Sequence, residues 1–84
     1  MQIEEIQRMI EQGIAGSKVM LDGDGTHFYA VVVSDEFNGK NMVQRHQMVY
    51  KTLGEKMGKE VHALSIRALT SEEWEKQREL GLHR

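Results

Sequence analysis

The sequence contains no cysteine and no proline, and aromatic residues make up only 6% of its 84 residues. Without cysteine the chain has no disulfide scaffold, no thiol nucleophile and no Cys-based zinc finger. It also cannot hold an iron–sulfur cluster by itself, since such clusters are normally carried by thiolates. Any metal site must therefore use His, Asp or Glu, or take ligands from a partner.

Long apolar runs are missing as well. No run approaches the roughly 20 residues that a helix needs to span a bilayer, and the first ten residues lack the apolar segment of a secretory signal. We therefore expect a cytoplasmic protein with no membrane association. The net charge of −2 provides no overall attraction to nucleic acid. Hydrophobic residues at 39% and charged residues at 29% are typical of a globular protein, and this length allows a single domain, residues 1–84.

Apolar spacing predicts a helix and two strands in the first half of the chain. Over residues 2–14, isoleucines recur every three or four positions and glycines follow, as at a helix end. Residues 18–21 and 27–34 are predicted strands, separated by an Asp-Gly-Asp-Gly turn at 22–25. Both faces of the second strand are apolar, so we expect it to be central and to pair with the first in an antiparallel hairpin.

In the second half of the chain, the apolar spacing predicts a helical stretch over 42–57, which Gly54 could divide in two. A strand is predicted over 61–69. A capping box at 70–73 opens a last helix, which Trp74 should anchor onto the sheet, and the tail over 80–84 should fray. The apolar stripe of the helical stretch consists of Val43, Val49, Tyr50, Leu53 and Met57.

Two strands joined through a helix are nearly always connected by a right-handed crossover, which makes the second and third strands parallel. The predicted fold is therefore a small α+β domain of element order αββααβα. It has a three-stranded mixed sheet with helices packed on it, and one face of the sheet is expected to be covered more fully than the other.

Two of the four histidines, His27 and His62, stand at the starts of the second and third predicted strands. Parallel neighbours begin at the same edge of a sheet, about 4.8 Å apart, so the two imidazoles could face one metal centre. The alternative is that each histidine only caps its strand or bonds a carbonyl group. His46 lies on or beside the helical stripe and is interpreted as structural, and His83 lies in the tail.

The most basic stretch contains Lys40, Arg45 and Lys51, with His46 between them. We interpret it as a solvated helix surface, with a nucleic-acid groove as the alternative. The G-x-x-G sequence at 13–16 matches the loop by which KH domains grip a nucleic-acid backbone, but here it joins a predicted helix to a strand. No nucleophile–base set and no phosphate-binding loop is recognisable, so we do not expect an enzyme.

Four blocks of the sequence form a recognisable pattern. They are His27-Phe28, Val33-Ser34-Asp35-x-Phe37-x-Gly39-Lys40, Arg45-His46-x-x-Val49-Tyr50 and His62-Ala63-Leu64-Ser65-Ile66-x-Ala68-x-Thr70-x-x-Glu73-Trp74. Together these blocks resemble the BolA family in the same order and spacing, and the resemblance covers about residues 3–78. The short Asp-Gly-Asp-Gly turn is similar to the IbaG-type bacterial branch of that family. The resemblance implies a KH-like α+β fold, which agrees with the predicted element order.

The resemblance further implies a non-enzymatic role in iron–sulfur cluster handling, with a monothiol glutaredoxin as partner. The glutaredoxin and glutathione thiolates would hold one iron of a bridging [2Fe–2S] cluster, and this chain would supply ligands to the other iron. His62 matches the family's C-terminal histidine ligand. For the second ligand we choose His27, with Asp24, a harder oxygen ligand, as the alternative.

The family is also linked to transcriptional regulation and nucleic-acid binding, which gives the second hypothesis, a KH-like regulator of the stress and morphology type. The residues predicted to form a partner or nucleic-acid surface are Phe37, Gly39, Lys40, Arg45 and His46. Alone, the chain is expected to be a monomer or a weak homodimer without a cofactor.

Overall fold

The computed structural model describes residues 2–24, 27–59, 61 and 63–79. His62 and the predicted frayed tail lie outside the described residues. The elements are α1 (Ile3–Gly13), β1 (Lys18–Gly23), β2 (His27–Val33), η1 (Asp35–Phe37), α2 (Met42–Leu53), η2 (Gly54–Lys56), β3 (Ala63–Leu69) and α3 (Ser71–Glu79). Gly54, with a φ of 53°, ends α2 and begins the short 3-10 helix η2, so the predicted division of the helical stretch is confirmed. No helix within these ranges has the length and apolar character to cross a bilayer.

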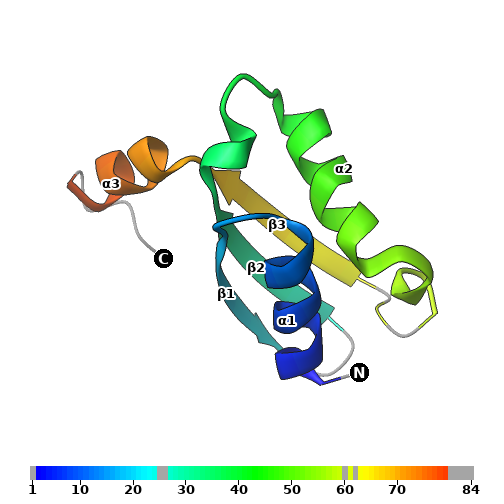
Figure 1. The fold of residues 1–84 in the computed structure, drawn as a ribbon. Helices are drawn as coiled ribbons and strands as arrows, with labels where there is room; N and C mark the ends of the chain where they lie inside the picture. The colour runs from blue at the N-terminus through cyan, green and yellow to red at the C-terminus, as the bar shows by residue number, and fades with distance from the viewer. Residues whose placement is uncertain (1, 25–26, 60, 62, 80–84) are drawn as a thin grey trace.

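The sheet has the predicted mixed topology, with β2 in the centre (Figure 1). β1 pairs with β2 antiparallel, and β3 pairs with β2 parallel. The parallel register joins His27 to Ala63 and Val33 to Leu69. β2 and β3 therefore begin at one end of the sheet and finish together at the other end, roughly 20 Å away at about 3.3 Å per residue.

The core lies between one face of the sheet and the two helices α1 and α2 (Figure 1). Alternate residues of β2, namely Phe28, Ala30 and Val32, point into this core and are at most 2% exposed. The opposite sheet face is covered less, since Tyr29 of the same strand is 59% exposed. The expected difference between the two faces is thus confirmed, and it follows from having two helices on one side. The buried core consists of Ile6, Ile10, Ile14, Val19, Phe28, Ala30, Val32, Phe37, Val49, Leu53 and Val61.

Two members of the predicted α2 stripe do not belong to the core. Val43 is 65% exposed and Tyr50 is 38% exposed. They are seven residues apart and share one flank of the helix, whereas Val49 and Leu53 point into the core about 100° away around the axis. The apolar stripe is therefore wider than the arc that the sheet and α1 cover.

The predicted role of Trp74 as an anchor onto the sheet is also wrong. Trp74 is only partly buried, and α3 contributes no buried residue to the core. α3 begins directly after Thr70, which itself follows β3, so no connecting loop returns the helix over the sheet. It extends instead from the end of the sheet (Figure 1).

α1 ends at Gly13, where it lies against α2. A Cβ atom on Gly13 would stand 2.5 Å from Cγ2 and 2.8 Å from Cβ of Thr52. Carbon atoms pack at about 3.5–4.0 Å, so any larger residue would push the two helices apart.

We therefore predict that Gly13→Ala lowers the free energy of unfolding by about 1–3 kcal/mol through overpacking. This is opposite in sign to the intrinsic helix preference for alanine over glycine. Urea unfolding followed by circular dichroism measures the change, and Gln12→Ala, at the preceding exposed position, is the control. A Gly13→Ala variant as stable as the native chain would contradict the close helix contact.

Candidate functional site

The first candidate site is the edge of the sheet where β2 and β3 begin. The register places His27 beside Ala63, which directly follows His62 in the sequence. His62 itself lies outside the described residues, so its role as a ligand stays a prediction. The side chain of His27 is 63% exposed, and its imidazole is accessible to a molecule that approaches this edge.

Asp24 closes the hairpin turn just before β2. Its Oδ1 accepts a hydrogen bond from the main-chain N–H of His27 at 2.8 Å, and its own N–H donates to the His27 carbonyl at 3.1 Å. The other carboxylate oxygen lies 3.7 Å from His27 Nδ1. The preceding Gly23 is required, since a Cβ there would stand 2.6 Å from the His27 carbonyl oxygen. Asp24 thus has a structural role in the turn and also places an oxygen beside the imidazole.

This edge does not form a self-contained metal centre from the described residues. Among them, no three His, Asp or Glu side chains gather closely enough to hold a metal ion. A closed structural zinc site needs four ligands. Among the described residues, this edge offers a metal ion the imidazole of His27 and the neighbouring carboxylate of Asp24.

The other predicted site residues lie at the opposite end of the sheet, where Arg45 of α2 joins four segments. Its Nη1 donates to the Ala68 carbonyl at 3.0 Å and to Glu73 Oε1 at 2.7 Å. Its Nε donates to the Lys40 carbonyl at 2.9 Å, and the guanidinium carbon lies 5.8 Å from the centre of the Phe37 ring, within cation–π range. The Arg45 side chain is only 14% exposed, so its described role is structural.

Phe37 was predicted on the binding surface, and this is wrong for its side chain, which is 0% exposed. The loop after β2 winds into η1, whose first turn is capped by Ser34. The Ser34 hydroxyl accepts from the Glu36 N–H at 3.1 Å and donates to the Ala15 carbonyl at 3.0 Å. This local turn directs the ring of Phe37 into the core.

Three predicted surface residues remain accessible near this end. Gly39 and Lys40 are exposed, and His46 is half-buried. They lie at the end of the sheet opposite His27, because neighbouring Arg45 contacts Ala68 near the end of β3. The structure therefore separates His27 and Asp24 from the predicted basic surface.

The capping box predicted at the start of α3 is present. The Glu73 N–H donates to the Thr70 hydroxyl at 3.2 Å, and the Thr70 N–H donates to Glu73 Oε1 at 2.9 Å. The hydrogen bond from Arg45 is the largest cause that lowers the pKa of Glu73 below its ordinary range, and the Thr70 N–H adds to it. The carboxylate therefore stays ionised at neutral pH and bridges α2 to α3.

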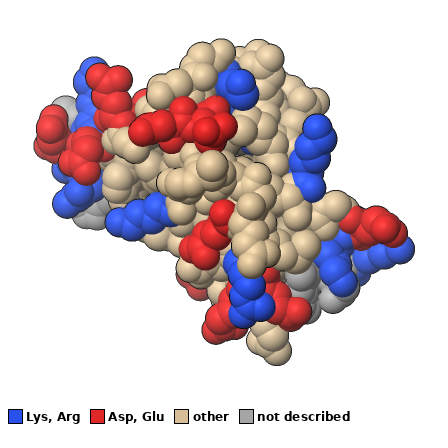
Figure 2. All heavy atoms as spheres, viewed as in Figure 1, with Lys and Arg blue, Asp and Glu red and all other residues tan. Residues whose placement is uncertain are grey.

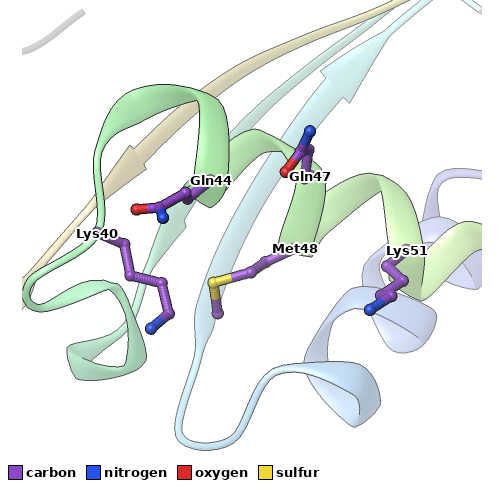
Figure 3. A pocket seen from close by; sticks show the side chains of 5 residues that line it. All are labelled: Lys40, Gln44, Gln47, Met48 and Lys51. Carbon is purple, nitrogen blue, oxygen red and sulfur yellow. The ribbon is translucent and has the colours of Figure 1, made fainter.

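A shallow cavity of about 350 Å³ opens on the outer side of α2. It is lined by Lys40, Gln44, Gln47, Met48 and Lys51 (Figure 3). The amides and the methionine were missed by the sequence reasoning, although their spacing of three or four residues marks one helix face. In Figure 2 the surface over α2 is largely uncharged with isolated basic side chains, and residues 37–54 contain no Asp or Glu. Its two lysines and two amides could bind an anionic group.

The sequence model of the family described as BolA-like protein matches residues 5–73. This chain belongs to the BolA family. It is 36% identical over 82 residues to the acid stress protein IbaG of Escherichia coli K12, covering 96% of this chain and 98% of that protein. It is also 45% identical over 53 residues to the DNA-binding transcriptional regulator BolA of the same strain, covering 63% of this chain and 50% of the regulator. The match thus spans about half the length of the regulator.

Solved structures agree with this BolA-family assignment. A BolA homologue from Coxiella burnetii matches with a TM-score of 0.82 and 39% identity, over 89% of this chain and 97% of that one. The predicted α+β fold is confirmed by this likeness and by the element order.

The bridge between Arg45 and Glu73 generates a pH prediction. Because the folded-state pKa of Glu73 is lowered, its carboxylate stabilises the fold above the ordinary glutamate value of about 4.3. This contribution is lost as the pH falls through the lowered folded-state value. We expect Glu73→Gln to reduce the free energy of unfolding at pH 7 by no more than about 1 kcal/mol, since the carboxylate is partly exposed.

The measurement is urea unfolding between about pH 7 and pH 3, in which the acid-dependent loss should be smaller for Glu73→Gln than for the native chain. Glu72→Gln, the adjacent exposed glutamate, is the matched control for the loss of one charge. Identical pH profiles for the two variants would contradict the bridge.

Proposed function

We propose that this chain is a non-enzymatic factor in iron–sulfur cluster handling that works as the partner of a monothiol glutaredoxin. It would co-ligate a bridging [2Fe–2S] cluster through His62 and His27, with Asp24 as the alternative to His27. The observation that carries the proposal is the parallel register, which sets His27 beside Ala63, the residue after His62.

The chemistry of the described residues supports a shared site. The chain has no cysteine, so the thiolates that normally hold such a cluster must come from the glutaredoxin and glutathione. The exposed imidazole of His27 is open to an approaching partner. Imidazole in place of thiolate on one iron would raise the reduction potential of the bound cluster, as it does in Rieske centres.

The test is an anaerobic titration of a cluster-loaded monothiol glutaredoxin with this chain, followed by visible circular dichroism. The native chain should produce a new spectrum that saturates near one chain per glutaredoxin. His62→Ala and His27→Ala should change that spectrum, because each removes a ligand, while the far-ultraviolet spectrum of the fold is kept. Asp24→Asn distinguishes the two candidates for the second ligand.

His83→Ala is the matched control, since His83 belongs neither to the predicted ligands nor to the predicted partner surface. Its cluster spectrum should equal that of the native complex. If His62→Ala gives the native spectrum in a verified complex, His62 is not a ligand. If the native chain changes nothing, the cluster proposal fails as a whole.

The cavity on α2 supports a second candidate function, binding of nucleic acid. Lys40 and Lys51 stand at its two ends (Figure 3), and a relative carries the name of a DNA-binding transcriptional regulator. The net charge of −2 places this function second.

If nucleic acid binds there, affinity for a short DNA probe should fall steeply with salt, because phosphate contacts release counterions. Lys40→Ala with Lys51→Ala should weaken binding and reduce the salt slope by about two, one for each phosphate contact. Fluorescence anisotropy at several salt concentrations gives both quantities. Lys59→Ala, an exposed lysine outside the cavity, is the control. No binding at low salt would exclude this function.

A further inference from the structure

β3 is an edge strand of the sheet, and part of its outer side is open. The Ala68 carbonyl accepts a hydrogen bond from Arg45 of α2 and so points away from β2. Alternate residues of a strand direct their main-chain groups to the same side. The N–H and C=O groups of Ile66 and Leu64 therefore point outward as well.

Both ends of this outer side are occupied by the chain itself. Arg45 covers the Ala68 end, and Val61 pairs with the segment around Met57 at the other end. Between them, the outward main-chain groups of Leu64 and Ile66 make no hydrogen bond with any residue that the structure describes. Unpaired N–H and C=O groups in a row are a template for one more strand.

The helix-covered side of this open stretch is apolar. Leu64 and Ile66 point toward the core but stay partly exposed, whereas their neighbours in β2, Phe28 and Ala30, are 1% and 2% exposed. The core is thus buried at the centre of the sheet and accessible at the β3 edge. Apolar side chains of an added strand would be buried here.

One flank of α2 adds exposed apolar surface. Thr52 meets Gly13, so its side of the helix faces α1. At 100° per residue, Val43 and Tyr50 lie about 160–180° around the axis from Thr52, on the flank turned away from α1. Val43 is 65% exposed and Tyr50 is 38% exposed.

The other sheet face beside this stretch is polar and basic. Ser65 and Arg67 alternate with the apolar residues of β3 and are exposed. Arg67 donates from Nη2 to Gln77 Oε1 at 2.9 Å and makes no ion pair with any residue that the structure describes. Its positive charge is therefore available to a carboxylate on this face, whereas Arg45 is already paired with Glu73.

We propose that the outer edge of β3 binds an extended peptide segment of a partner protein in which apolar and acidic residues alternate. The segment would add a fourth strand through the main chain of Leu64 and Ile66, with its apolar side chains toward the α2 flank and its carboxylates toward Arg67. A nucleic-acid backbone fits less well, because its phosphates offer acceptors but no donors for the outward carbonyl groups. This inference does not depend on cluster ligation.

The probe is an acetylated and amidated heptapeptide of alternating glutamate and valine, titrated into the ¹⁵N-labelled full chain. The Leu64 and Ile66 amides should shift saturably and exchange their hydrogens more slowly with peptide bound. Two control peptides are used. The first is the same peptide N-methylated at its valines, which removes main-chain N–H donors. The second has the same composition, but its valines and glutamates are grouped in separate blocks, which removes the alternation. Both controls should bind at least about tenfold more weakly.

A charge reversal tests the orientation. The Arg67→Glu variant should bind the glutamate–valine peptide more weakly than the native chain does, and it should bind a lysine–valine peptide instead. The Lys59→Glu variant should still prefer the glutamate–valine peptide. Far-ultraviolet circular dichroism confirms that both variants fold.

Four outcomes would overturn the proposal. In the first, the amide signals of Leu64 and Ile66 do not change when the peptide is added. In the second, the N-methylated peptide binds as tightly as the original peptide. In the third, an oligothymidine probe slows hydrogen exchange at these amides and the peptide does not, and in the fourth, concentrating the chain alone slows it. The third outcome would assign the edge to nucleic acid, and the fourth to a second copy of the chain.

Discussion

The guanidinium group of Arg45 is the contact on which the far end of the sheet depends. It bonds two main-chain carbonyls and the carboxylate of Glu73 while lying over the ring of Phe37. The Arg45 side chain is only 14% exposed, and its positive charge is tolerated there because these acceptors replace the hydrogen bonds that water would make. Through this one side chain, the start of α2, the end of β3 and the start of α3 keep fixed positions.

Much of the sequence pattern typical of the BolA family is used for this architecture. Ser34 caps η1, Phe37 fills the core, and Thr70 with Glu73 opens α3. The edge proposed to bind a cluster involves far fewer side chains, of which His27 is described. Family membership is therefore carried largely by residues that build the fold, and the proposed chemistry needs few additional ones.

Periodicity was sufficient to predict the elements and the parallel pairing, because each depends on local spacing and on the handedness of crossovers. It failed where burial depends on a neighbour in space. Phe37 lies in a polar segment, yet the turn of η1 buries it. Tyr50 lies at the margin of the apolar stripe, where it stays 38% exposed. For the candidate site, the alignment of His27 with position 63 could be predicted, whereas the contact of Asp24 with His27 depends on the turn geometry.

The parallel register also joins segments that lie far apart along the chain. β1 and β2 are neighbours along the chain, and their hairpin closes between Gly23 and Phe28, whereas the β2–β3 pairing joins position 27 to position 63. Closing the longer loop costs more chain entropy, and contacts between distant residues slow folding. The hairpin is thus a local unit, and the edge with His27 is completed only when β3 docks. A molecule that binds across β2 and β3 selects the finished fold and stabilises it by mass action.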